Sequence, residues 1–175
     1  QSKFNDSNQN LHIDLCNNTC EPLCKVRDII LYGFGRIGRA LTRILLDTGN
    51  YPLRLKVVVV RPGNLINRIN LLKQDSVHGK FSGSILISDN VVTINGHDIL
   101  FIESNDPESV SYPELCKPII IDNTGKWRDK IGLAKHLIAK PESQVIVTCP
   151  SPELPNVVYG INHQPFLNHK LLSAA

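Results

Sequence analysis

Strand-like and helical patterns alternate along the chain from about residue 27. Residues 29–32 are apolar and precede a glycine-rich turn, which predicts a buried strand. From Ile37 the apolar positions recur at helical spacing, and the predicted helix ends at residues 48–50, Thr-Gly-Asn. Residues 53–60 are apolar except for Arg54 and Lys56, which is typical of a parallel strand covered on both faces. Together these segments predict a βαβ unit with a right-handed crossover.

The pattern after residue 60 predicts an antiparallel insertion followed by a return to parallel strands. The insertion consists of short apolar runs separated by the hairpin-turn dipeptides Asp89-Asn90 and Asn95-Gly96. The predicted helices cover residues 65–72 and 127–138, and the predicted strands cover residues 84–88, 91–94, 99–102, 118–121, 144–147 and 156–159. The predicted fold class is α/β, a doubly wound, mostly parallel sheet with an inserted antiparallel hairpin.

Length and composition agree with one globular domain that follows an extension. The chain has 175 residues, of which 42% are hydrophobic and 20% charged, so a disordered chain, a collagen or a coiled coil is not expected. Residues 1–26 are polar and rich in Asn, and they are predicted to form an N-terminal extension to a domain of residues 27–175. Apolar runs stay well short of the roughly 20 residues of a membrane-spanning helix, and the first residues do not resemble a signal peptide. We therefore expect no membrane partner.

Charge and cysteine content narrow the classes of partner. The net charge is only +3 and the basic residues are scattered, so no nucleic-acid partner is expected. Five cysteines without a secretory signal indicate reduced thiols and a cytoplasmic protein. Cys16, Cys20 and Cys24 lie four residues apart, but a structural zinc ion usually takes four ligands in paired short spacings, so no metal site is predicted. A regulatory-thiol or partner-docking role for these three cysteines is an open alternative.

The turn between the first predicted strand and helix carries the pattern of a phosphate-binding loop. Gly33, Gly35 and Gly38 form a G-x-G-x-x-G sequence with a strand before it and a helix after it. Glycine lets the backbone turn sharply and approach a pyrophosphate, which the free N–H groups and the positive helix end attract. The sequence therefore predicts a Rossmann-like fold that binds a dinucleotide. A glycine turn that merely saves space is the structural alternative.

The end of the second predicted strand departs from the usual pattern of NAD-binding folds. Such folds usually place Asp or Glu there to hold the adenosine ribose hydroxyls. Here Arg61 occupies that end and no acidic residue follows before Asp75. A guanidinium attracts a 2′-phosphate where a carboxylate would repel it, so Arg61 favours NADP or the acceptance of both NAD and NADP. The alternative is that Arg61 only stacks on the adenine or points to solvent.

Several ordered motifs resemble glyceraldehyde-3-phosphate dehydrogenase. The segment Tyr32-Gly33-Phe34-Gly35-Arg36-Ile37-Gly38-Arg39 resembles the N-G-F-G-R-I-G-R of that family, with Tyr32 where Asn is usual. In the same order, residues 75–81 resemble D-S-T-H-G-K-F, residues 94–96 I-N-G, residues 122–125 E-S-T-G, residues 148–151 S-A-P-S, and residues 160–163 G-V-N-H. The resemblance covers residues 27–175 and leaves the N-terminal extension outside.

The resemblance implies a set of cofactor contacts and an assembly. It places Gly33, Phe34, Gly35, Arg36, Ile37 and Gly38 at the pyrophosphate, Arg61 at the adenosine ribose, Asn123, Thr124 and Gly125 beside the nicotinamide ribose, and Thr148 and Cys149 near the nicotinamide ring. The family forms tetramers, so the full-length protein is expected to be a homotetramer. His78, inside a matched motif, is interpreted as a hydrogen-bonded loop residue rather than a catalyst.

The catalytic residues of the family are expected to lie outside this chain. The family uses a Cys nucleophile in the sequence S-C-T-T-N, and residues 172–175 resemble the segment just before it. Cys149 lies in another motif and does not take its place. We therefore expect the dinucleotide-binding half of a phosphorylating, glycolytic enzyme, present as a fragment that is inactive alone. The alternatives are the related erythrose-4-phosphate dehydrogenase and a non-catalytic NAD(P)-binding or scaffold module.

Overall fold

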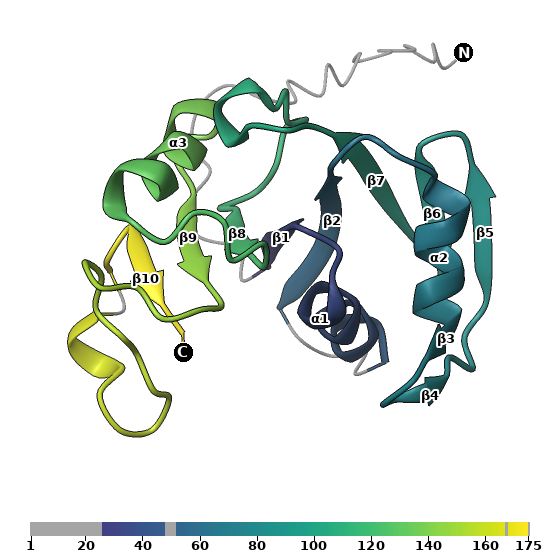
Figure 1. Ribbon diagram of the computed structural model, residues 1–175, viewed down its shortest axis with the longest axis horizontal. Coiled ribbons are helices and arrows are strands. Elements are labelled where there is room, and N and C mark those ends of the chain that lie inside the picture. Colours follow the sequence, from purple (N-terminus) through teal and green to yellow (C-terminus); the bar gives the residue numbers. More distant parts are fainter. Residues whose placement is uncertain (1–25, 48–51, 167, 175) are drawn as a thin grey trace, which may run out of the picture.

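A computed structural model describes residues 26–47, 52–166 and 168–174 of the chain. Most of the described strands form one sheet, in the order β10-β9-β8-β1-β2-β7-β6-β5 (Figure 1). Their bounds are β1 Arg27–Tyr32, β2 Leu53–Val60, β5 Ile85–Ser88, β6 Val91–Ile94, β7 His97–Glu103, β8 Ile119–Asp122, β9 Gln144–Val147 and β10 Leu171–Ser173. Neighbours from β10 to β7 pair in parallel, whereas β5, β6 and β7 pair antiparallel. This topology confirms the predicted Rossmann-like class with its antiparallel insertion.

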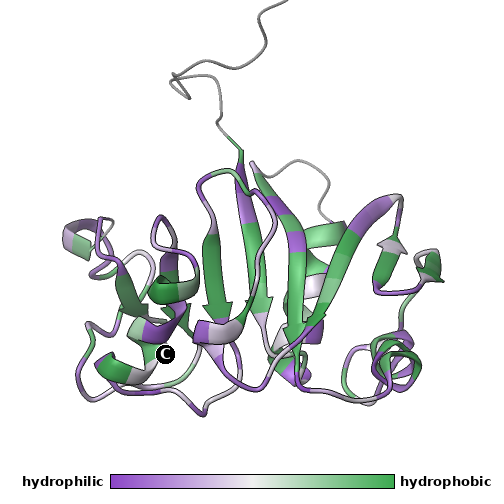
Figure 2. Ribbon diagram, turned by 90° about the horizontal axis from the view of Figure 1, so that it is seen from above, coloured by the Kyte–Doolittle hydropathy of each residue, from purple (hydrophilic) through white to green (hydrophobic). Residues whose placement is uncertain are grey.

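Alternate residues of the central strands pack into two separate hydrophobic cores, one on each face of the sheet. Ile29 and Leu31 of β1 belong to one hydrophobic cluster, whereas Ile30 and Tyr32 belong to the other. Successive side chains of a strand point to opposite faces, so a strand that is apolar throughout must be covered on both sides. Figure 2 shows these strands side by side, hydrophobic along much of their length, with their arrowheads toward the same edge. Loops meet at that edge.

Helices cover both faces of the sheet, as the doubly wound prediction requires. Helix α1 (Arg36–Asp47) and helix α2 (Leu65–Lys73) pack on the face that contains Ile29, through Leu46, Ile69 and Leu72. Helix α3 (Lys130–Ala139) packs on the opposite face, through Leu133. The short 3₁₀ helices η1 (Pro107–Ser109) and η2 (Gln164–Phe166) lie in connecting segments.

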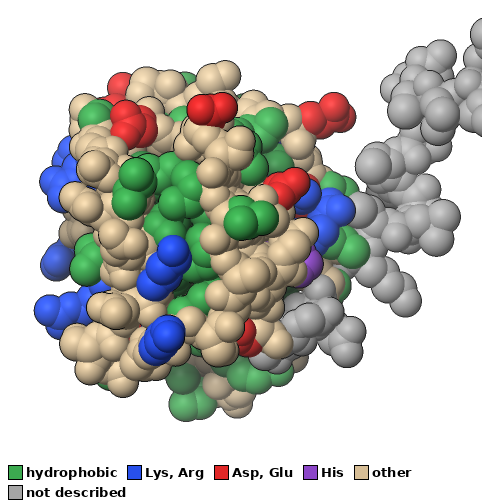
Figure 3. Space-filling model, turned by 90° about the vertical axis from the view of Figure 1, so that its right-hand side faces the viewer, with side chains coloured by type: hydrophobic (Ala, Val, Ile, Leu, Met, Phe, Trp, Pro, Cys, Tyr) green, Lys and Arg blue, Asp and Glu red, His purple; other side chains and the backbone are tan. Residues whose placement is uncertain are grey.

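Two peripheral features complete the described part of the chain. Strands β3 (Gln74–Asp75) and β4 (Gly79–Lys80) form a separate two-stranded sheet. Strand β5 is an edge strand whose Leu86 and Ile87 are 70% and 41% exposed. Figure 3, viewed from that side, shows hydrophobic side chains on the surface there. None of the helices in the described ranges is long and apolar enough to cross a bilayer.

Two predicted elements differ from the structure. The helix predicted from residue 127 begins at Lys130, because the side chain of Asp129 accepts the N–H of Gly132 and caps the helix there. The strand predicted at residues 156–159 is wrong: only Asn156 makes a bridge, to Ser173, and the strand in this region is β10. The chain turns at residues 158–162 instead, where Asn162 accepts the N–H of Val158 through its side chain.

Two other predictions fall on residues that the structure does not describe. The helix end at residues 48–50 lies outside the described residues, as do residues 1–25 of the extension with their three cysteines. Of the other two cysteines, neither Cys116 nor Cys149 forms a disulfide with a described residue.

Candidate dinucleotide-binding site

A cavity of about 640 Å³ opens at the carboxyl ends of β1, β2 and β8. The crossover from β1 leads to β2 on one side of the sheet, and β8 lies on the other side of β1, so the strand order reverses at this point. In open α/β sheets, ligands bind in the crevice that such a reversal leaves. The cavity is lined by Tyr32, Gly33, Phe34, Gly35, Arg39, Val59, Val60, Arg61, Arg68, Leu71, Ser104, Asn105, Asn123, Thr124, Lys126 and Trp127.

The glycine turn brings backbone close to this cavity in a way that side chains would block. Gly33 has a φ of 98°, and a β-carbon on it would lie 3.0 Å from Cγ2 of Thr124. A β-carbon on Gly38 would collide with the backbone carbonyl of Gly33, so helix α1 packs against the turn without a side chain between them. No described atom lies within 4 Å of the position that a β-carbon of Gly35 would take. A ligand can therefore approach the backbone at Gly35.

The electrostatics of the cavity favour an anion. The first turn of α1 contains no acidic residue, and its positive helix end meets the glycine turn. Arg39, Arg61, Arg68 and Lys126 line the cavity, and none of its lining residues is Asp or Glu. Two of these arginines are held by backbone carbonyls. Arg39 Nη1 donates to the carbonyl of Phe34 at 3.2 Å, and Arg68 Nη2 donates to the carbonyl of Arg61 at 2.7 Å.

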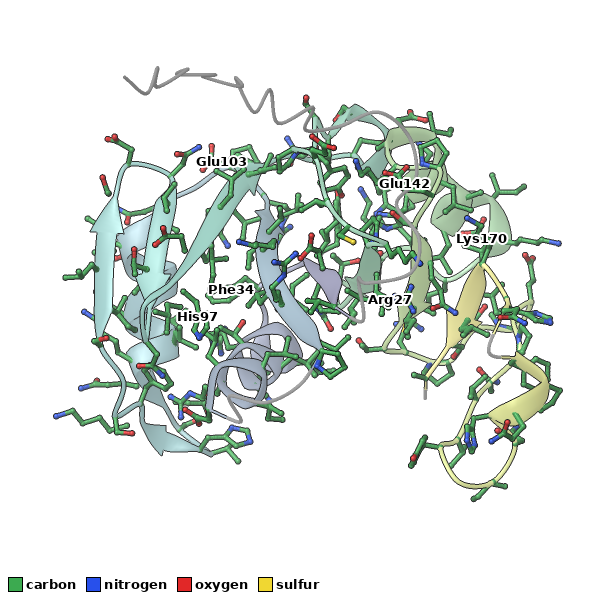
Figure 4. All side chains as sticks on the ribbon, turned by 180° about the vertical axis from the view of Figure 1, so that it is seen from behind. Arg27, Phe34, His97, Glu103, Glu142 and Lys170 are labelled. Carbon is green, nitrogen blue, oxygen red and sulfur yellow. The ribbon has the colours of Figure 1, made fainter. Side chains whose placement is uncertain are left out.

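The end of β2 has a carboxylate neighbour that the sequence pattern does not predict. Arg61 follows β2 and is exposed at the cavity. Glu103, at the end of the adjacent strand β7, accepts the N–H of Gly63 at 3.0 Å (Figure 4). Glu103 does not line the cavity, but it lies beside the turn that Arg61 begins.

The loop after β8 forms the wall opposite the end of β2. Asn123 and Thr124 line the cavity, and Gly125 follows with a φ of 64°. The carboxylate of Asp122 accepts both the N–H and the hydroxyl of Thr124, each at 2.7 Å. The loop is thereby fixed to the last residue of β8, which is itself fully buried.

Six of the predicted cofactor contacts do not line the cavity. The predicted residues that do line it are Gly33, Phe34, Gly35, Arg61, Asn123 and Thr124, and those that do not are Arg36, Ile37, Gly38, Gly125, Thr148 and Cys149. Gly38 lies behind the turn, and Thr148 donates its N–H and its hydroxyl to the carbonyl of Asp122. Phe34 packs edge-on against Phe101, with ring centroids 5.3 Å apart, and lies between β7 and α1 in Figure 4.

Several lining residues were not predicted from the sequence. Ser104 and Asn105 directly follow β7, and the rule that sites gather at the carboxyl ends of parallel strands could have found them. Trp127, the single tryptophan of the chain, has the ammonium of Lys126 4.2 Å from its ring centroid. Tyr32 also lines the cavity, and burial, followed by the charges of Asp122 and Asp106, raises its pKa to about 12.

The environment of His78 agrees with a loop residue. The side chain of Asp75 accepts the backbone N–H groups of Val77 and His78 and also contacts His78 Nδ1 at 3.1 Å. Hydrogen bonds from these backbone groups hold the pKa of Asp75 well below its usual range. Among the described residues, no group of three or more His, Cys, Asp or Glu side chains could hold a metal ion.

Comparison with known proteins assigns the chain to a protein family. The model of the family described as glyceraldehyde 3-phosphate dehydrogenase, NAD binding domain, matches residues 27–130, which is more than half of the chain. The chain therefore belongs to this family, whose members bind a cofactor of the NAD type. The match spans the glycine turn, the end of β2, and the loop after β8.

The names of individual relatives also include glyceraldehyde-3-phosphate dehydrogenase. The chain is 46% identical over 159 residues to a glyceraldehyde-3-phosphate dehydrogenase-like protein of Pseudomonas aeruginosa (strain UCBPP-PA14), covering 85% of this chain and 34% of that protein. It is 32% identical to glyceraldehyde-3-phosphate dehydrogenase 1 of Kluyveromyces lactis, over 84% of this chain and 44% of that protein. It is 35% identical to chloroplastic glyceraldehyde-3-phosphate dehydrogenase B of Pisum sativum, over 79% of this chain and 31% of that protein. The chain thus spans less than half the length of these curated relatives.

Proposed function

We propose that residues 27–175 form the dinucleotide-binding half of a phosphorylating glyceraldehyde-3-phosphate dehydrogenase. The observation that carries the proposal is the open backbone at Gly35, between the end of β1 and the positive end of α1, in a chain of this family. The turn and α1 would receive the pyrophosphate through backbone N–H groups. Arg39 and Lys126 would add positive charge beside it.

The two ends of the dinucleotide would lie on opposite sides of the glycine turn. Arg61 and Arg68, at the end of β2, would face the adenosine ribose, and the loop of Asn123, Thr124 and Gly125 would face the nicotinamide half. Thr148 would act indirectly, because it donates to the backbone of Asp122 just before this loop. A bound nicotinamide would supply the hydride acceptor of the reaction. The residues of this chain would bind and orient the cofactor.

The reaction itself belongs to the proposed full-length protein. This chain spans only 34% to 44% of the first two relatives described above, so a second region would supply the nucleophilic Cys and its His base. In that reaction the thiolate would attack the aldehyde carbon, a bound nicotinamide would supply the hydride acceptor, and phosphate would take the acyl group from the resulting thioester and regenerate the thiolate. Assays of the full-length protein with glyceraldehyde 3-phosphate and erythrose 4-phosphate would separate the two candidate substrates. The 175-residue chain is expected to turn over neither substrate.

Further expectations for the full-length protein follow from the family resemblance. We propose that it is a homotetramer in the cytoplasm that contacts neither nucleic acid nor a membrane. Size-exclusion chromatography with light scattering would test the assembly, and a monomeric full-length protein would contradict it.

Cofactor choice is proposed to depend on the end of β2. The positive charge of Arg61 and Arg68, with no carboxylate on the cavity wall, supports acceptance of the 2′-phosphate of NADP. Glu103 beside the turn is the observation that favours NAD, because a carboxylate can accept the ribose hydroxyls. The proposal is that Arg61 dominates, since it lines the cavity and Glu103 does not.

Isothermal titration calorimetry with NAD and NADP tests both parts of this proposal. Wild-type protein is expected to bind both, and Arg61→Asp is expected to weaken NADP binding more than NAD binding. Lys80→Asp is the matched control, because it makes the same charge reversal at an exposed residue outside the cavity. Equal losses for the two cofactors in Arg61→Asp would refute the role of Arg61. Absence of binding by the wild type would refute the proposed site.

A further inference from the structure

A fully buried Asp–His pair lies directly behind the loop that faces the cavity. Asp122 ends β8 and His136 lies in the last turn of α3, and both side chains are 0% exposed. His136 Nε2 and Asp122 Oδ2 are 3.0 Å apart. A buried carboxylate is costly unless its oxygens are hydrogen-bonded, so each contact of Asp122 matters for its position.

The carboxylate of Asp122 connects helix α3 to the cavity wall. Its Oδ1 atom accepts the N–H and the hydroxyl of Thr124, and its Oδ2 atom faces His136. Thr124 lines the cavity, and its methyl carbon would lie 3.0 Å from a β-carbon on Gly33, so it packs next to the glycine turn. A chain of direct contacts therefore runs from His136 through Asp122 and Thr124 to the turn.

The contacts of His136 identify which ring nitrogen carries the proton. Nδ1 is buried and has no hydrogen-bond partner within the described ranges of the chain. A proton on Nδ1 would leave a buried donor unpaired and would turn the lone pair of Nε2 toward a carboxylate oxygen. We therefore assign the proton to Nε2, which donates to Asp122. The ring is held in place edge-on against Tyr32, with centroids 4.7 Å apart.

We propose that His136 is a positioning residue for the dinucleotide site. Its single N–H occupies Oδ2 of Asp122, which leaves Oδ1 to hold Thr124 against the glycine turn. Without that donor, the buried Oδ2 atom lacks its partner, and the carboxylate rotates toward the donors that remain, those of Thr124. The loop then moves away from the geometry that receives the cofactor. This inference rests on the proposed function, because it assigns a role within the same site.

Three variants separate this role from simple support of the core. His136→Leu removes the donor, and His136→Gln places an amide N–H at about the reach of Nε2. Leu133→Ala, on the same helix, removes buried volume from the hydrophobic cluster on this face of the sheet. In calorimetric titrations with NAD, His136→Leu is expected to raise Kd roughly tenfold, in line with the cost of an unpaired buried polar group. His136→Gln is expected to stay near wild type, and Leu133→Ala to lower Tm with Kd unchanged.

A double-variant cycle tests whether the effect passes through Thr124. Thr124→Val removes the hydroxyl group that donates to Asp122. The double variant with His136→Leu is expected to have about the same Kd for NAD as the single variant with the higher Kd. Fully additive losses would overturn the proposed route. If His136→Leu does not fold, His136→Asn takes its place, because the shorter amide falls short of Asp122 and predicts the same loss.

The outcomes distinguish this inference from the proposed function. If wild-type protein fails to bind NAD, the proposed site itself is wrong. If wild-type protein binds NAD and His136→Leu, or its replacement His136→Asn, binds it equally well, only the role of His136 is wrong. A loss of affinity in Leu133→Ala as large as that in His136→Leu would also overturn it, because core support alone would then explain the effect.

Discussion

Replacing Gly33 by alanine perturbs the turn on which the proposed site depends. Gly33 has a φ of 98°, and a β-carbon there would lie 3.0 Å from Cγ2 of Thr124. The left-handed backbone costs an L-residue about 1–2 kcal/mol, and crowding against Thr124 adds to it. We therefore expect Gly33→Ala to lower the free energy of unfolding by at least about 1–2 kcal/mol. For a domain of this size, that corresponds to a Tm lower by roughly 2–8 °C.

Gly96 provides a matched control for the backbone strain. It has a φ of 80° in the turn between β6 and β7, and a β-carbon on it meets no described atom within 4 Å. Gly96→Ala is therefore expected to lose a comparable free energy of unfolding without touching the cavity. Only Gly33→Ala is expected to weaken NAD binding, by about tenfold or more, which corresponds to about 1.4 kcal/mol. The reason is that the crowded turn must move its backbone away from the pyrophosphate.

Two measurements on the same samples check this expectation. Urea unfolding followed by the fluorescence of Trp127 gives the stability of each variant, and calorimetric titration with NAD gives the affinity. Unchanged affinity in Gly33→Ala would refute the assignment of the turn to the pyrophosphate. Equal losses of affinity in Gly33→Ala and Gly96→Ala would show that strain anywhere in the domain explains the effect.

Further predictions concern pH, the core and a helix end. Backbone N–H donors hold the pKa of Asp75 well below its usual range, so its stabilising contribution is present above about pH 4 and is lost as the pH falls below that value. In urea unfolding, the free energy of unfolding should change less between about pH 5 and pH 3 in Asp75→Asn than in the wild type. An equal change in both proteins would contradict this role of Asp75. Leu72→Ala should lower the free energy of unfolding by about 2–5 kcal/mol, because Leu72 is fully buried. Asn64→Ala should cost about 1 kcal/mol, because Asn64 caps α2 through the N–H of Asn67. Chemical denaturation measures both, and losses below about 0.5 kcal/mol would contradict these assignments.

Local sequence patterns predicted most strands of the sheet, because apolar runs mark its central strands and turn dipeptides mark its hairpins. Residues 53–60 are apolar except for Arg54 and Lys56, and this run matches a strand with a core on each side. Asn95 and Gly96 turn the chain with positive φ values of 50° and 80°, which these residue types accept at low cost. The strand predicted at residues 156–159 is wrong, because the apolar residues there flank a turn fixed by the side chain of Asn162.

The cavity-lining residues that were predicted from the sequence all lie in local motifs, namely the glycine turn, the end of the second strand and the segment of Asn123 and Thr124. The glycine turn carries its own signature, so Gly33 and Gly35 were found from the sequence. Arg68 and Trp127 reach the cavity from α2 and from the loop before α3, and no local pattern shows which face of those segments meets β1. The burial of His136 against Asp122 also depends on the packing of α3 on the sheet. Such contacts follow from tertiary structure.

The most direct test of the central claim is amide chemical-shift mapping by NMR of the 175-residue chain titrated with NAD. Saturable shifts are expected at Gly33, Gly35, Thr124 and Trp127, which surround the cavity at the carboxyl ends of β1, β2 and β8. A second cavity, of about 430 Å³, has Asp28 and Arg54 among its lining residues and serves as an internal control that should not respond. Shifts confined to that second cavity, or no shifts with NAD in large excess, would contradict the proposed dinucleotide-binding site.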